Sequence, residues 1–247
     1  MKPLGGRVVL VTRPADQSAA LVRLLRKAGA QAIVGPSIRI APVRSAALTR
    51  ALRDLRAGRF AWIVLTSRST VEMLSGRLGA PADVRANVAA IGEGTSEAFR
   101  AWARRTPDLV PATFTNAALA RNFPRGQGRV LCARADIAPS GLEDALAAKG
   151  WTPTRVDAYR TLMPRSLPAE AAAALRDGRV DVLTFTSAST VRGFVGAVRV
   201  VRGEPKVVCI GPVTAREARA RGLWVAAVAR SHTIEGLAEA VERALRR

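Results

Sequence analysis

The chain has 247 residues, of which 49% are hydrophobic and 23% are charged. This composition suits one large or two small domains with a sizeable core, and it excludes disordered and fibrous proteins. The formal net charge is +20, but 35 of the 39 basic residues are arginines spread along the whole chain. We interpret this excess as a compositional bias and keep a preference for a polyanionic ligand or a nucleic acid as the alternative.

The first half of the chain alternates short β-branched runs with amphipathic stretches of helical period. The predicted strands are 8–12, 32–35, 62–66, 88–91 and 108–110, and the predicted helices are 15–28, 45–57, 68–78, 95–104 and 115–123. The second half repeats this order, from RVLCA at 129–133 to a helix at 233–246. Strands that are apolar throughout and alternate with helices are typical of a parallel sheet covered on both faces.

The two halves also match in sequence, at an offset near 120 residues. TSRSTV at 66–71 matches TSASTV at 186–191, and VAAIGEGTSEA at 88–98 matches VVCIGPVTARE at 207–217. A period of this length indicates a duplicated structural unit, since it is too long for a solenoid repeat. Five strands in each unit predict a flavodoxin-like, doubly wound sheet.

The repeated turns supply most of the candidate binding residues. In open parallel sheets, ligands bind outside the carboxyl ends of the strands, where the following helices begin. Backbone N–H groups and hydroxyls at helix starts suit a carboxylate or a phosphate, and glycine lets a ligand approach the backbone. The candidates are Thr66, Ser67, Gly92 and Thr95 in one unit and Thr186, Ser187, Gly211 and Thr214 in the other. The alternative for each Ser or Thr is a plain helix cap.

Three further residues stand out. Arg13 and Arg134 follow the first strand of each unit at matching positions. Each is expected either to contact an anionic ligand or to tie its loop to the neighbouring helix. Tyr159 is the only tyrosine and lies where a strand runs into a proline-containing segment. Its ring either packs against that segment or presents the hydroxyl to a ligand.

Several common catalytic constellations are missing from the sequence. No Walker loop is present, and GEG at 92–94 does not extend to the dinucleotide-binding glycine pattern. His232 is the only histidine, which argues against a histidine metal cluster, and we expect it on the surface. Glu143 and Asp144 are expected on a helix surface. No metal or cofactor is therefore expected, and an enzyme with this sequence would work by orienting a reactive substrate.

Location and partners follow from simpler features. Cys132 and Cys209 lie in apolar runs, so we expect core thiols of a reduced, cytoplasmic protein. No apolar run reaches the roughly 18 residues of a membrane span, and the first residues lack the layout of a signal peptide. We expect a monomer with no membrane partner.

Taken together, the motifs resemble the uroporphyrinogen-III synthase family over nearly the whole chain. The matching pieces are VLVTRP at 9–14, TSRSTV at 66–71, VAAIGEGT at 88–95, AYRT at 158–161, FTSASTV at 185–191, IGPVTAREARARGL at 210–223 and the Thr-x-Glu-Gly-Leu run at 233–237. Each piece is weak alone, and their order and spacing make the match specific. SHT at 231–233 departs from the pattern, because the family more often has a proline before the threonine.

The resemblance implies a fold and a domain division. It implies two α/β domains joined by a two-stranded β-ladder, with one domain formed by 1–36 and 169–247 and the other by 45–158. The linkers are then 37–44 and 159–168, which contain several prolines and show no helical period. The repeat alone is equally compatible with two sequential domains.

The resemblance also implies an activity. The family closes the linear tetrapyrrole hydroxymethylbilane to uroporphyrinogen III, with loss of water and inversion of ring D, and uses no cofactor. The substrate carries carboxylates around its rings, which the two sets of helix starts are expected to hold. Tyr159 is then the candidate acid for the departing hydroxyl.

Two other functions remain open. One is a non-catalytic two-domain binder of a small polyanionic ligand. The other is a basic nucleic-acid-binding protein, against which the few aromatic residues and the lack of a known binding motif count. No nucleic-acid partner is expected.

Overall fold

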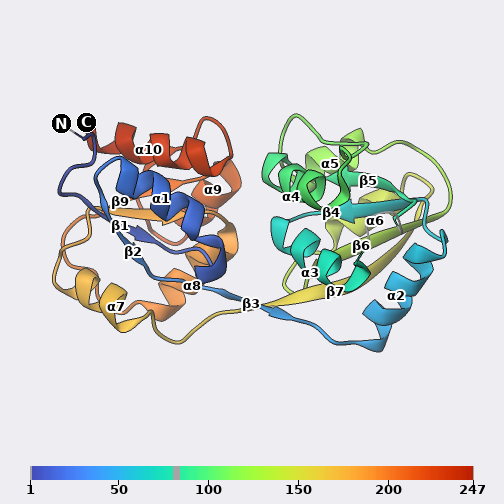
Figure 1. The fold of residues 1–247 in the computed structure, drawn as a ribbon, viewed down its shortest axis with the longest axis horizontal. Coiled ribbons are helices and arrows are strands. Elements are labelled where there is room, and N and C mark those ends of the chain that lie inside the picture. Colours follow the sequence, from blue (N-terminus) through green and yellow to red (C-terminus); the bar gives the residue numbers. More distant parts are fainter. Residues whose placement is uncertain (1, 80–83, 247) are drawn as a thin grey trace. The chain divides into compact units, whose positions relative to one another are not determined.

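Two five-stranded sheets organise residues 2–79 and 84–246, the part of the chain that the computed structural model describes (Figure 1). The chain divides into two units, which are described separately. Unit 1 consists of Met1–Arg39 and Leu162–Arg247, and unit 2 of Ile40–Thr161. Each sheet is flanked by helices (Figure 1). The predicted class, α/β with two doubly wound sheets, is therefore confirmed.

The sheet of unit 1 is parallel throughout, in the order β10-β9-β8-β1-β2. Its strands are β1 (Val8–Val11), β2 (Gln31–Val34), β8 (Val182–Phe185), β9 (Lys206–Cys209) and β10 (Val225–Val228). Its helices are α1 (Ala19–Lys27), α7 (Ala169–Arg176), α8 (Ala188–Ala197), α9 (Pro212–Ala220) and α10 (Ile234–Arg246), with a 3-10 turn at Ala15–Gln17.

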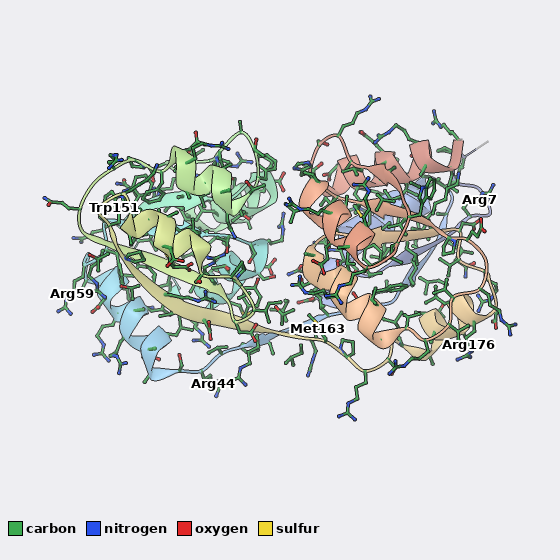
Figure 2. All side chains as sticks on the ribbon, turned by 180° about the vertical axis from the view of Figure 1, so that it is seen from behind. Arg7, Arg44, Arg59, Trp151, Met163 and Arg176 are labelled. Atoms are coloured by element: carbon green, nitrogen blue, oxygen red, sulfur yellow. The ribbon has the colours of Figure 1, made fainter. Side chains whose placement is uncertain are left out.

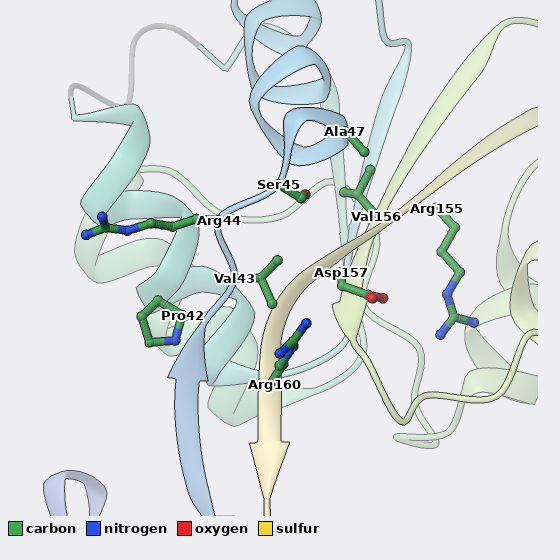
Figure 3. A pocket seen from close by; sticks show the side chains of 9 residues that line it. All are labelled: Pro42, Val43, Arg44, Ser45, Ala47, Arg155, Val156, Asp157 and Arg160. Atoms are coloured by element: carbon green, nitrogen blue, oxygen red, sulfur yellow. The ribbon is translucent and has the colours of Figure 1, made fainter.

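The sheet of unit 2 has the order β3-β7-β6-β4-β5. Its strands are β3 (Arg39–Pro42), β4 (Trp62–Leu65), β5 (Asn87–Ala90), β6 (Arg129–Ala135) and β7 (Thr152–Leu162). Its helices are α2 (Ala46–Arg56), α3 (Arg68–Leu78), α4 (Glu93–Ala103), α5 (Asn116–Asn122) and α6 (Gly141–Ala147). Strands β4 to β7 are parallel, whereas β3 runs opposite to its neighbour β7 (Figure 3).

Each sheet takes strands from both halves of the sequence repeat. β1 and β2 pair with β8, which lies in the second half, while β4 pairs with β6. Counted by position in the repeat, both sheets then show the doubly wound order 2-1-3-4. The chain therefore crosses between the units along β3 and β7.

Alternate residues of the buried strands face opposite layers, as the two-residue period of a strand requires. In β1, Val9 and Val11 pack with α1 and α10, whereas Leu10 packs with α7, α8 and α9. In β4, Val64 packs with α5 and α6, and its neighbours face α2, α3 and α4. Burying each such side chain contributes about 1.5–3 kcal/mol. These two-sided cores fix the position of every strand end.

Exposed arginines occur on the outer surface of both units. Arg7, Arg59 and Arg176 are exposed and extend away from the sheets (Figure 2). Within the described residues, no helix combines the length and the apolar character that a membrane crossing requires.

Two predicted elements differ from the structure. Residues 108–110 form no strand, because only Leu109 makes a single bridge, to Ala89. Pro107 and Pro111 flank this segment, and a proline cannot donate to a sheet ladder. The helix predicted at 15–28 begins as a 3-10 turn, and its α-helical part starts only at Ala19.

Candidate active site

Ser67 lies at the carboxyl end of β4 and caps helix α3. Its backbone is extended (φ −161°), and its Oγ accepts a hydrogen bond from the N–H of Thr70 at 3.0 Å. The Thr70 hydroxyl lies 2.9 Å from the same oxygen. Thr66 and Ser67 are both half-buried. The structure therefore confirms that Ser67 caps a helix.

The side-chain oxygen of Ser67 also contacts the hydroxyl of Tyr159. The phenol oxygen lies 3.0 Å from Ser67 Oγ, and the ring packs into the core that α2, α3 and α4 form with the sheet. Tyr159 is only 7% exposed. Burial raises the pKa of its hydroxyl, and the hydrogen bond with Ser67 acts in the opposite direction without cancelling that rise. The phenol is therefore protonated at neutral pH and can donate.

Unit 1 has the same helix start without a tyrosine. Ser187 caps α8, and its Oγ accepts from the N–H of Thr190 at 3.1 Å. The Ser187 N–H in turn donates to Thr190 Oγ1 at 3.2 Å, which completes a capping box. The hydroxyl of Ser189 takes the place of a phenol here, and its Oγ lies 2.9 Å from that of Ser187. Thr186 is half-buried, like Thr66. The two serines thus form a matched pair with different partners.

Glycine begins the next helix in each unit. Gly92 is the N-cap of α4 and Gly211 the N-cap of α9, both with extended backbone. A Cβ at Gly92 would lie 2.7 Å from Phe114 Cγ, so only glycine fits there without a shift. A Cβ at Gly211 would lie 3.4 Å from the ring of His232. His232 is half-buried and its ring lies near this helix start, so it is less exposed than a fully solvated surface residue.

Thr95 and Thr214 occupy the third position of α4 and α9. They are 5% and 4% exposed, and the Thr95 N–H donates to the Gly92 carbonyl at 3.1 Å. Both helices point their N-termini at the carboxyl edge of their own sheet, because they follow β5 and β9. The N-terminal turn carries partial positive charge and unused N–H groups, which favour an anion.

The two matched arginines, Arg13 and Arg134, are both buried. Arg13 follows β1 and is 8% exposed. Arg134 is 1% exposed, and its Nη1 donates to Glu143 Oε1 and Oε2 at 3.0 and 2.9 Å and to the Pro139 carbonyl at 3.1 Å. Arg134, which lies in β6, thus ties the end of this strand and the following loop to α6, which was the alternative to a ligand contact. Glu143 is 9% exposed, so its predicted place on a helix surface is wrong.

The contact between Ser67 and Tyr159 was not predicted from the sequence. The residues are 92 positions apart, and strand β6 separates β4 from β7 in the sheet. Only the strand order brings them together. Within 2–79 and 84–246, no group of three or more His, Cys, Asp or Glu residues could hold a metal ion.

Comparisons with known proteins agree with this arrangement. The sequence model of the family Uroporphyrinogen-III synthase HemD matches residues 19–239. The chain is 30% identical to a uroporphyrinogen-III synthase of Synechococcus elongatus, over 98% of this chain and 97% of the relative. It is 31% identical to the porphyrin biosynthesis protein HemD of Ruminiclostridium josui, over 96% of this chain and 48% of that protein.

Solved structures share the fold. A mutant uroporphyrinogen III synthase from Thermus thermophilus superposes with a TM-score of 0.67 at 23% identity, covering 97% of this chain and 99% of the other. The Helicobacter pylori uroporphyrinogen-III synthetase gives a TM-score of 0.62 at 16% identity, with 97% and 99% coverage.

Proposed function

This chain belongs to the uroporphyrinogen-III synthase family, and from that premise we propose how its residues carry out the reaction. The chain is an enzyme of tetrapyrrole biosynthesis that closes hydroxymethylbilane to uroporphyrinogen III. Water is lost and ring D is inverted. The substrate can also close unaided to the wrong isomer, so the enzyme must impose a conformation and speed the loss of water.

The helix starts of both units supply the binding groups. The substrate's carboxylates accept hydrogen bonds from the first-turn N–H groups of α3, α4, α8 and α9, where helix dipoles favour negative charge. The contributing side chains are Thr66, Ser67, Thr95, Thr186, Ser187, Thr214 and Arg13. Gly92 and Gly211 contribute the backbone at the starts of α4 and α9. Arg134 is left out of this set, because Glu143 already occupies its guanidinium.

Tyr159 is the catalytic acid in this proposal. The C–O bond of the hydroxymethyl group breaks with electrons from the pyrrole, the phenol proton leaves with the oxygen as water, and a protonated azafulvene (azafulvenium) remains beside the phenolate. The substituted carbon of ring D attacks this electrophile to give a spiro intermediate, which fragments and recloses in the inverted sense. On reclosure the unsubstituted carbon of ring D forms the new bond, and the proton that this carbon loses returns to the phenolate and restores the phenol.

Ser67 positions the phenol for this step. When its Oγ–H donates to the Tyr159 oxygen, the phenol proton is free for the leaving group, and the same bond stabilises the phenolate that forms. A well-placed general acid contributes about 10²–10⁴ in rate. The single observation that carries the proposal is this 3.0 Å contact between a buried tyrosine and the serine that begins α3.

Isomer analysis tests the function. The protein is incubated with freshly prepared hydroxymethylbilane, and the products are oxidised and separated by chromatography. We expect the type III isomer in excess over the type I isomer that forms without protein. A non-catalytic binder of the same substrate would yield type I alone.

The proposal also covers the location, the oligomeric state and the partners of the enzyme. We infer a cytoplasmic location from the two buried free cysteines. We further propose that the enzyme is a monomer and has no nucleic-acid partner. Light scattering tests the monomer. Filter binding to nucleic acid over a salt series tests for such a partner, since binding through phosphate contacts weakens steeply as the salt concentration rises.

A further inference from the structure

Unit 2 contains a hollow of about 610 Å³ beside the pairing of β3 with β7 (Figure 3). The segment that follows β3 forms one side, the middle of β7 another, and the first residues of α2 a third. A volume of this size lies in the range of small-molecule sites. Neither Ser67 nor Tyr159 lines the hollow. It is therefore separate from the catalytic pair described above.

Positive charge dominates the lining. Arg44, Arg155 and Arg160 contribute three guanidinium groups, and Asp157 is the single carboxylate, which leaves a balance of +2 among the lining residues. Figure 3 shows Arg44 on the segment after β3 and the other three along β7. Concave surfaces with one sign of charge concentrate counter-ions more strongly than flat ones.

Two of these arginines are available to a ligand. Arg44 and Arg160 are exposed, and neither side chain makes a hydrogen bond or an ion pair with the part of the chain that the structure describes. Arg155 is half-buried, and its Nη2 donates to the Ala138 carbonyl at 2.6 Å, which fixes the direction of its side chain. The hollow thus combines one anchored guanidinium with two that can turn toward an anion.

The start of α2 adds to the same field. Ser45 caps this eleven-residue helix by accepting from the Leu48 N–H at 3.1 Å, and Ser45 and Ala47 both line the hollow. The partial positive charge of the helix N-terminus therefore borders the same hollow as the three arginines. The arginine-rich composition does not by itself place arginines at this hollow, because Arg50 and Arg53 on α2 do not line it.

We propose that this hollow binds a small, multiply charged phosphate-type oxyanion at a site distinct from the active site. Arginine forks match the tetrahedral oxygens of phosphate in pairs. A group with several charges satisfies Arg44 and Arg160 together, whereas a single carboxylate neutralises only one of them. The ligand is of pyrophosphate size, either free or as part of a small metabolite.

Calorimetric titration with inorganic pyrophosphate at constant ionic strength tests this site. The double variant Arg44→Gln with Arg160→Gln removes the two free guanidinium groups. The double variant Arg50→Gln with Arg53→Gln, on helix α2, is the charge-matched control. All four positions are exposed, so both variants should fold, which circular dichroism checks. We expect saturable binding in the wild type and the control, and about tenfold weaker binding for each hollow arginine removed.

The KM for hydroxymethylbilane is measured in parallel, and we expect the same value in all three proteins. Equal weakening of pyrophosphate binding in both double variants would show only general attraction to a basic surface and overturn the proposal. Absence of saturable binding to the wild type would overturn it as well. A raised KM confined to the Arg44 and Arg160 variant would assign the hollow to the substrate instead. The titration does not depend on catalysis, so its outcome is independent of the proposed mechanism.

Discussion

The variants Ser67→Ala and Ser187→Ala form a matched pair that isolates the contact between Ser67 and Tyr159. Both serines cap a helix by the same bond, at 3.0 Å to Thr70 N and 3.1 Å to Thr190 N. Loss of such a cap costs about 1 kcal/mol of stability. In a chain of this size, that loss lowers the melting temperature by about 2–4 °C. Loss of the cap alone should therefore destabilise the two variants alike, and Ser67→Ala loses the bond with Tyr159 in addition.

Their activities should differ. Only Ser67 lies 3.0 Å from the phenol oxygen, and a hydrogen bond to a group that becomes charged is worth about 1.5–3 kcal/mol. If Ser67 stabilises the phenolate formed when water leaves, kcat of Ser67→Ala should fall about tenfold to a hundredfold. Ser187→Ala loses a substrate contact without this catalytic bond, so its effect should lie mainly in KM.

Scanning calorimetry and steady-state kinetics on the two variants check these values. Steady-state rates are corrected for unaided closure of the substrate. Equal kcat in Ser67→Ala and Ser187→Ala, at equal loss of melting temperature, would refute the positioning role of Ser67. It would leave the serine as a helix cap and nothing more.

Three further expectations follow from the same geometry. The double variant Thr95→Ala with Thr214→Ala should raise KM far more than either single change, because the remaining backbone N–H groups still bind the substrate when one hydroxyl is lost. Steady-state kinetics of the three variants checks this. Gly92→Ala should be less stable than Gly211→Ala by about 1–3 kcal/mol in urea unfolding, because only the first Cβ meets a ring atom at 2.7 Å. Tyr159 is the only tyrosine, so tyrosinate absorbance should titrate with a midpoint above the ordinary value of 10.0 in the native protein, since burial raises its pKa, and return to it in denaturant.

The fold was predictable to a large extent because its signals are local. Apolar runs such as VVLV and WIVL, each followed by a helical period, define parallel strands whatever their partners. Strand pairing is a different matter. β1 and β6 have matching sequences, so either could pair with β4 or with β8 on the basis of pattern alone. Family resemblance, and not periodicity, indicated the crossing.

The site was predictable where it depends on spacing and unpredictable where it depends on packing. Ser67 and Ser187 were found because a hydroxyl between a strand and a helix marks a helix start. Glu143 was misplaced because a helical pattern does not reveal that a neighbouring loop buries Arg134, which then requires a counter-ion. The partner of Tyr159 depends on strand order in the same way.

Tyr159→Phe, assayed for both rate and product isomer, tests the central claim most directly. The claim is that the helix starts impose the substrate's conformation while the phenol supplies a proton. Phenylalanine keeps the ring in the core and deletes only the hydroxyl bonded to Ser67. The account predicts that kcat falls by about 10²–10⁴, that KM stays close to the wild-type value, and that the enzymatic product remains type III. Wild-type kcat, or a product shifted to type I, would contradict it.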